Sequence, residues 1–475
     1  MWRTVSIVAV LAVAAFVSPS ATGEPGDRDA TLTSIIAEAA GVPPEFSADA
    51  LIRVAGSAKV VDRSWKRELL DDAFLRAYAA PVDVRRISST VPPESRQFAE
   101  REAADTPLAR IALQSRAVQM MAAVDPSRAI ELFEWIDLSL APASCGGMLV
   151  PVADEYYLTA SLLARTAFPR DRGEALRFLE YYLWRAHLPT ELAAVALAVD
   201  RFRPTPAEAT QLEGLLTSLM DAGSSDPRGF SVGNADIVGR FADLQFADRN
   251  RNVPGWFLVE GVRKYLTSHL GGPRCSDSTT ESTVPATFNL ALKLLGADLE
   301  VKPIDANAIR PSRLLTGASI DFLWQTGESR RLFDDWMELR GRGRDPLPGR
   351  ERRTDTWRTA AERFITDVDE WTGRSEASER DYLYEKATLY YNIIGLTSPG
   401  TIRVRAIRSL TAFLRHENND RSRRPLWFVF VGRLLDLSRS DARHDVLDAM
   451  EGSGDPVLSL YARLERIVPS GQRKR

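Results

Sequence analysis

Ser231 is the residue whose surroundings come nearest to a known catalytic string. It lies between two glycines in Gly229-Phe-Ser-Val-Gly233, a spacing typical of a nucleophilic serine on a sharp turn between a strand and a helix. Such a serine needs an apolar strand before it and a histidine as general base. Residues 223–228 are instead a loop of Gly, Ser, Asp, Pro and Arg. We therefore interpret residues 229–233 as a connector between helices and assign no catalytic residue.

Adjacent carboxylates offer a second route to catalysis. They occur as Asp71-Asp72, Asp334-Asp335 and Asp367-Val-Asp369. Glycoside hydrolysis needs two carboxyl groups about 5–10 Å apart across a sugar site, a geometry that sequence spacing alone does not supply. Adjacent acids on an amphipathic helix normally form its solvated face, and this is our interpretation of the three pairs. A hydrolase is the alternative interpretation.

Metal and cofactor sites have no support in the sequence. The chain has four His and two Cys, and it contains no His-Glu-x-x-His, Cys-x-x-Cys, Walker or Gly-x-Gly-x-x-Gly string. We expect neither a metal nor a cofactor.

The two cysteines, Cys145 and Cys275, each follow an apolar helical run and a proline. In an oxidising compartment they could form a disulfide, which by the chain-entropy relation would stabilise the fold by up to about 5 kcal/mol. Two separate buried thiols are the equally weighted alternative.

Residues 1–23 indicate the compartment in which the protein works. Arg3 precedes the apolar run Val5–Val17, and Ala21-Thr-Gly23 has the small-x-small pattern of a signal-peptidase site. The run is too short for a comfortable spanning helix, and no later segment is apolar enough to span. We expect an exported protein, periplasmic or extracellular, with no transmembrane segment after signal removal.

Charge is nearly balanced, with 61 Lys and Arg against 64 Asp and Glu and a net charge of −3. This argues against nucleic acid as a partner. The segment 340–353 is an exception, because it holds six arginines among Gly and Pro. We expect an exposed linker, which could bind an anionic envelope polymer or simply be solvated. The arginines are Arg340, Arg342, Arg344, Arg350, Arg352 and Arg353.

Almost every other segment has the apolar spacing of an amphipathic helix, with steps of three and four. Trp65, Leu69, Ala73 and Ala77 are one such stripe. Helix starts are marked by Asp-Pro or by a capping box. The sequence predicts N-caps at Asp125, Asp171 and Asp455.

Two stretches resemble tetratricopeptide and HEAT-type helical repeats. They are Asp125–Ile136 and residues 379–437, in which Ala387, Tyr390 and Tyr391 precede Leu410 and Leu414 in the next helix. This resemblance implies an all-α fold of antiparallel helix pairs stacked as an α-solenoid. The chain would divide into a signal peptide (1–23), an N-terminal array (24–339), the linker (340–353), a C-terminal array (354–468) and a basic tail (469–475).

Such an array creates an extended groove without special residues. We therefore expect a non-catalytic interaction or scaffolding protein, whose partner is another envelope or secreted protein. An envelope glycan- or ester-hydrolysing enzyme on a helical scaffold is the alternative.

Overall fold

The structure is a computed structural model of the chain. It describes residues 28–80, 85–87, 94–104, 108–138, 149–151, 153–227, 236–250, 253, 256–271, 274–276, 293, 314–316, 322–325, 327–342, 355–375, 377–417 and 423–468. The predicted signal peptide lies outside these residues.

Helices dominate the described residues, which confirms the predicted all-α class. The N-terminal set comprises α1 (Ala30–Ala39), α2 (Pro44–Ala55), α3 (Arg63–Ala79), α4 (Arg96–Ala104), α5 (Arg110–Ala122), α6 (Pro126–Glu134), α7 (Asp154–Ala167), α8 (Arg172–Leu183), α9 (Leu192–Phe202), α10 (Pro206–Gly223), α11 (Asp236–Asn250) and α12 (Trp256–Gly271).

The C-terminal set comprises α14 (Gly327–Arg342), α15 (Asp355–Glu370), α16 (Glu379–Leu396), α17 (Thr401–Glu417), α18 (Arg424–Leu437), α19 (Arg443–Glu451) and α20 (Pro456–Ile467). Four short strands accompany the helices: β1 (Arg85–Ile87) pairs antiparallel with β2 (Leu149–Pro151), and β3 (Arg274–Ser276) pairs parallel with β4 (Leu314–Thr316).

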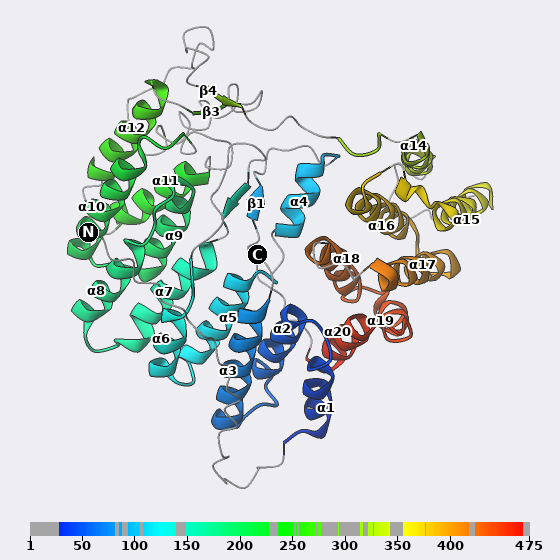
Figure 1. Cartoon of the computed structure of the whole chain (residues 1–475), viewed down its shortest axis with the longest axis horizontal. Coiled ribbons are helices and arrows are strands. Elements are labelled where there is room, and N and C mark those ends of the chain that lie inside the picture. The colour runs from blue at the N-terminus through cyan, green and yellow to red at the C-terminus, as the bar shows by residue number, and fades with distance from the viewer. Residues whose placement is uncertain are drawn as a thin grey trace, which may run out of the picture.

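The helices lie in two layers (Figure 1). In the N-terminal set the inner layer is α2, α5, α7, α9 and α11, and each of these packs on the next. The outer layer is α3, α6, α8, α10 and α12, each packed on an inner helix or on its outer neighbour. In the C-terminal set α14, α16, α18 and α20 form the inner layer, and α15, α17 and α19 form the outer one.

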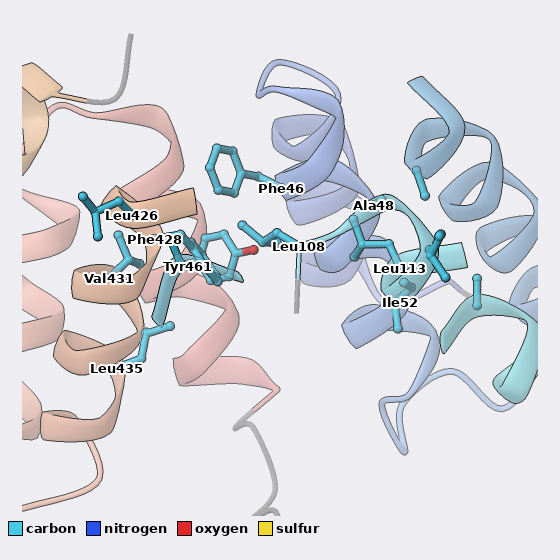
Figure 2. Close-up of a cluster of buried hydrophobic side chains, with 14 of the residues drawn as sticks. Phe46, Ala48, Ile52, Leu108, Leu113, Leu426, Phe428, Val431, Leu435 and Tyr461 are labelled. Carbon is cyan, nitrogen blue, oxygen red and sulfur yellow. The ribbon is translucent and has the colours of Figure 1, made fainter. Parts of the chain in front are cut away.

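The two sets meet where the chain begins and ends. The last helix, α20, packs against α1 and α2. Phe46 of α2 is fully buried there, with ring centroids 5.5 Å from Trp427, 5.5 Å from Phe428 and 6.3 Å from Tyr461. Figure 2 shows the shared apolar cluster. We call this contact the chain-end joint.

The predicted division at residue 340 is corrected in two ways. First, α14 packs on α15 and α16, so it groups with the C-terminal helices instead of the N-terminal array. Second, α14 continues through Arg342, three residues into the predicted linker. The ion pairs Arg330–Asp334 (3.1 Å) and Arg331–Asp335 (3.0 Å) support this helix at i,i+4 spacing, and the Arg340 guanidinium lies 5.5 Å from the Trp336 ring centroid.

The predicted caps are confirmed. Asp125, Asp171 and Asp455 each accept a hydrogen bond from a backbone N–H in the first turn of the following helix. The apolar stripe of α3 is buried as predicted. Among the described helices, none is both long and apolar enough to cross a membrane.

Candidate binding site on the inner face

Helix α4 is the element that departs from the two-layer order. It follows α3 in the chain, yet it packs against α18 of the C-terminal set and against β1. In Figure 1 it lies between the two arms of the inner layer. The helix thus occupies the inner face as a separate element. We call the surface beneath it the α4 seat, made of Asp381, Tyr384 and Glu385 of α16 and Arg433 of α18.

The first contact of the seat is a bidentate ion pair at the start of α4. Arg96 donates from Nε to Oδ1 of Asp381 at 2.9 Å and from Nη2 to Oδ2 at 2.7 Å. The Asp381 side chain is 9% exposed. Two parallel N–H···O bonds impose direction as well as attraction, so this pair orients the start of α4.

The second contact lies six residues further along α4. Glu102 accepts hydrogen bonds from Arg433 Nη2 at 2.7 and 2.8 Å and from the Tyr384 hydroxyl at 2.9 Å. Burial, followed by the charge of Glu102, raises the pKa of Tyr384 above its ordinary value. The phenol therefore stays protonated and donates. Arg433 also lies over the rings of Tyr391 (5.0 Å) and Phe430 (4.7 Å), which holds its guanidinium in place.

Helix α4 also buries two small apolar side chains. Ala99 and Ala103 are 4% and 2% exposed, and their i,i+4 spacing puts them on one helix face. The seat therefore recognises a short helix with a cation in its first turn, two small residues on the buried face and a carboxylate about 9 Å further along the axis.

Glu385 forms the deepest part of the seat. It is 2% exposed, and its Oε1 accepts hydrogen bonds from the Trp324 N–H at 2.7 Å and from the Ser329 hydroxyl at 3.5 Å. Burial raises the pKa of Glu385 to about 7, and Asp381 one turn earlier adds to the effect. Trp324 has a φ of 61°, a strained conformation for a bulky residue that the surrounding packing must maintain.

The residues before Trp324 tie this corner to α4. Leu323 donates its N–H to the Glu94 carbonyl at 2.7 Å, and Phe322 forms a β-bridge with Ser95. The start of α4 and the seat are thus fixed by backbone as well as by side-chain bonds.

The chain-end joint holds a second group of buried charges. Asp49 accepts hydrogen bonds from Arg116 at 2.7 Å and from the Tyr461 hydroxyl at 2.8 Å. Burial opposes the ionised form of Asp49, but the charges of Arg116 and Arg53 outweigh it and lower its pKa. Arg53 also pairs with Glu465 at 2.9 Å. These bonds join α2 and α5 to α20, so we assign them to the fold.

A cavity of about 250 Å³ opens beside the joint, at the starts of α2, α18 and α20. Of its two arginines, Arg424 already pairs with Glu45 at 3.1 Å. Asp455 is bound as the N-cap of α20. The cavity is lined by Pro43, Phe46, Arg415, Arg424, Gly454, Asp455, Pro456 and Val457. The lining combines apolar groups with charges, Arg424 and Asp455, that already have partners. It therefore indicates no particular ligand.

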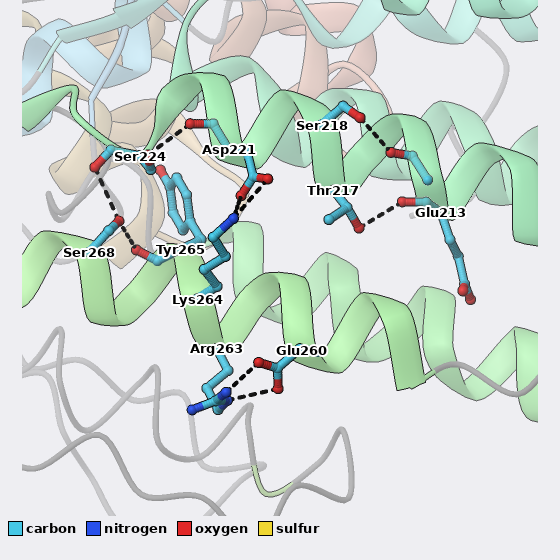
Figure 3. A network of polar contacts seen from close by, with 11 residues as sticks. Glu213, Thr217, Ser218, Asp221, Ser224, Glu260, Arg263, Lys264, Tyr265 and Ser268 are labelled. Carbon is cyan, nitrogen blue, oxygen red and sulfur yellow. Dashed lines mark hydrogen bonds and ion pairs between the residues drawn. The ribbon is translucent and has the colours of Figure 1, made fainter.

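A buried carboxyl pair joins α10 to α11. Glu213 and Asp248 are each 1% exposed and share a hydrogen bond. Burial, then the charge of Asp248, raises the pKa of Glu213 to about 7. Figure 3 shows the neighbouring contacts that hold α12 on α10, among them Lys264 with Asp221 at 3.0 Å. These acids are not among the residues that line the cavity at the chain-end joint.

Each acid singled out in the sequence is paired with an arginine: Asp71 with Arg128, Asp72 with Arg76, Asp334 with Arg330, Asp335 and Asp367 with Arg331, and Asp369 with Arg405. Asp335 and Asp367, from two different pairs, meet at Nη1 of Arg331, at 3.0 and 3.6 Å. Among the described residues no group of three or more His, Cys, Asp or Glu is placed to hold a metal ion.

Several sequence predictions lie outside the described residues. They concern Ser231, Cys145, Arg344, Arg350, Arg352 and Arg353. Cys275 is described only as the middle residue of β3, opposite Leu315, so the Cys145–Cys275 disulfide stays a prediction. Arg340 and Arg342 lie at the end of α14.

The residues of the α4 seat were missed by sequence reasoning. One signal was present: Asp381, Glu385 and Lys386 lie among the aromatic and apolar residues of α16, and all three are buried. The partners of Asp381 and Tyr384 on α4 lie more than 280 residues away in the chain, a separation that no local pattern spans.

Comparisons with known proteins add no relative: no family model, no curated protein and no solved structure matches this chain.

Proposed function

We propose that this protein is an exported, non-catalytic α-helical-repeat protein whose inner face binds a helical segment of another envelope or secreted protein. The layered helix pairs would form one α-solenoid, which continues through the chain-end joint. The observation that carries the proposal is α4 itself. A helix outside the two layers is held on the inner face by charges at both of its ends.

The chemistry of the seat supports exchange of that helix. Arg96 is 42% exposed, and the Arg433 and Glu102 side chains are 19% and 23% exposed. Partly exposed ion pairs contribute modestly and weaken with salt. A partner helix with the same arrangement of charges could therefore compete with α4 for these ion pairs. This is helix-in-groove recognition, with the groove formed by α16 and α18.

Export rests on residues 1–23, whose charged start, apolar run and small-residue end are those of a signal peptide. An envelope partner follows from that compartment.

The test is a crosslinking pull-down from the native envelope fraction, with three forms of the chain as bait. Arg96→Gln with Glu102→Gln frees the seat from α4, and Asp381→Asn with Arg433→Gln removes the seat. We expect the freed form to capture a reproducible protein more strongly than the wild type, and the form without the seat to lose it. Equal capture by all three forms would contradict the proposal.

No observation favours the hydrolase alternative over this one. The acids singled out in the sequence are each bound by an arginine, and none of them lines the cavity at the chain-end joint.

A further inference from the structure

The two residues before α4 contact the C-terminal part of the chain through their backbone. Ser95 forms an antiparallel β-bridge with Phe322, and the Glu94 carbonyl accepts the Leu323 N–H at 2.7 Å. The element on the inner face is therefore more than a helix. It is a helix together with the bridged residues that lead into it, and both parts have partners.

Ser95 also closes the start of α4. Its hydroxyl accepts the Phe98 N–H at 3.1 Å, which is the bond that an N-cap side chain makes with the third residue of a helix. Ser95 is fully buried, so its own hydroxyl serves this donor where an exposed helix start would use water. The first turn of α4 is thus completed inside the contact.

The bond between Glu94 and Leu323 requires a helix that begins at this point. In a continuous helix, the carbonyl of residue 94 would lie along the axis and accept the N–H of residue 98. Here the Phe98 N–H bonds to Ser95, and the Glu94 carbonyl faces Leu323 instead. A helix that continued through this point would leave the Leu323 N–H, on a buried residue, without its acceptor, which is costly.

The Leu323 N–H is held in place by contacts that do not involve α4. Trp324, the next residue, stacks on Phe333 of α14 with ring centroids 4.8 Å apart. Its N–H donates to Glu385 of α16 at 2.7 Å. Both partners belong to the C-terminal set, so this donor is already positioned for a second segment that replaces α4.

The cation at the start of α4 is explained by the seat and not by the helix. The positive end of the helix dipole disfavours a cation in the first turn and favours an anion. Arg96 is nevertheless the first residue of α4, and it binds Asp381 in the first turn of α16. The Arg96–Asp381 pair therefore joins the starts of two helices.

We infer that the α4 seat recognises the start of a helix and not a stretch within one. The partner segment enters through a bridged residue pair, has a serine as its N-cap and an arginine directly after it. Alanine-sized residues follow four and eight positions after the serine, and a glutamate follows seven positions after it. The corresponding residues of this chain are Ser95, Arg96, Ala99, Ala103 and Glu102. The inference rests on the proposed function and specifies the segment that would replace α4.

Two fluorescent peptides test this. The first is residues 94–104, acetylated and amidated. The second keeps Arg96 to Ala104, but Ser95 is replaced by alanine and two turns of alanine and glutamine, about seven residues, precede Glu94. One helix then runs through the cap position. Both peptides are titrated into the chain with Arg96→Gln and Glu102→Gln, whose own α4 is released.

The two peptides give opposite expectations for the two kinds of recognition. The second is the more helical in solution, which circular dichroism measures, and a preordered helix loses less entropy on binding. Recognition of any helix with these charges would therefore favour the second peptide. We expect the first peptide to bind at least tenfold more tightly, and Arg433→Gln to weaken the binding of both.

A matched pair of variants tests the hydrogen bond to Glu94. Leu323→Pro removes the N–H and the side chain, whereas Leu323→Ala removes the side chain alone. We expect Leu323→Pro to bind the first peptide at least tenfold more weakly than Leu323→Ala does. Circular dichroism reports a loss of the fold in Leu323→Pro, and the comparison of the two peptides on the unaltered corner then decides.

The outcomes separate this inference from the proposed function. Equal or tighter binding of the second peptide overturns the inference and leaves the proposed function standing. Equal binding of the first peptide by folded Leu323→Pro and Leu323→Ala also overturns it. If neither peptide binds the released form, the proposed function fails and the inference fails with it.

Discussion

The chain-end joint and the α4 seat both join segments that are far apart in the sequence, but they do so by different means. At the joint, Phe46, Trp427 and Tyr461 are each at most 1% exposed and interlock with one another. At the seat, α4 is held by two partly exposed groups of ion pairs, Arg96–Asp381 and Glu102–Arg433, together with the backbone contacts of Glu94 and Ser95 and the buried Ala99 and Ala103.

The difference separates a permanent contact from an exchangeable one. Burial of large apolar rings stabilises a contact regardless of salt, whereas partly exposed ion pairs contribute little and are screened. The joint therefore makes one continuous body of the two helix sets. The proposed function requires that the helix on the seat can leave without unfolding that body.

The largest expected effect is at the joint. Phe46→Ala removes a fully buried ring from the cluster in Figure 2 and should lower the free energy of unfolding by about 3–5 kcal/mol. Chemical denaturation measures it. Val61→Ala, at a residue that is 83% exposed, is the control and should change stability by less than about 0.5 kcal/mol. A small loss for Phe46→Ala would mean that the joint is not a common core.

Removing a buried charge at the joint should lower the free energy of unfolding more than removing one at the seat. Asp49→Asn leaves the mostly buried Arg116 without its carboxylate, whereas Arg53 keeps Glu465, and we expect a loss of about 3 kcal/mol. Asp381→Asn is the matched variant at the seat, where Arg96 can turn to water, and it should cost about 1 kcal/mol. Equal losses in denaturation experiments would remove the distinction between the two contacts.

Glu385 should make stability depend on pH. Its pKa is raised to about 7 in the folded chain, so the folded state binds its proton more tightly than the unfolded state does. The stability from this group is complete below the ordinary pKa of about 4.5 and is lost as pH rises through about 7.

Glu385→Gln cannot ionise and keeps an oxygen for the Trp324 N–H. It should match the wild type near pH 4.5 and exceed it by about 2 kcal/mol at pH 8. Thermal unfolding at both pH values measures this. Glu213 stays unchanged in both chains, so its own titration cancels. Parallel pH profiles would show that Glu385 is not protonated in the folded state.

The smallest global effect is expected for Glu102→Gln, at about 1 kcal/mol or less, because the charges that it removes are partly exposed. Its local effect should be larger: amide hydrogen exchange in residues 96–104 should accelerate, while exchange in α2 and α20 stays unchanged. Raising the salt concentration on the wild type should reproduce the same pattern. Faster exchange in all three helices would mean that the seat and the joint open together.

Local features of this fold are predictable from the sequence, and its long-range contacts are not. The caps at Asp125, Asp171 and Asp455 follow from side chains that bind a backbone N–H within three residues. The stripe of α3 follows from helical periodicity. By contrast, Tyr461 meets Asp49 across 412 residues, and nothing in either segment encodes the other.

The linker prediction shows why the ends of helices are harder to predict from sequence than their centres. Glycine and like charge after residue 339 predict a break, yet α14 continues to Arg342. The preceding i,i+4 ion pairs and the Arg340–Trp336 contact favour an extra turn. Side-chain contacts within the helix thus outweigh propensity over three residues.

The most direct test of the exchangeable inner face is to supply α4 as a separate molecule. A fluorescent peptide of residues 94–104 is titrated into the wild type and into Arg96→Gln with Glu102→Gln, whose own α4 is released. The account predicts that the peptide binds the released form at least tenfold more tightly, and that adding Arg433→Gln abolishes this binding. Equal affinity for the wild type and the released form, or no binding to either, would contradict it.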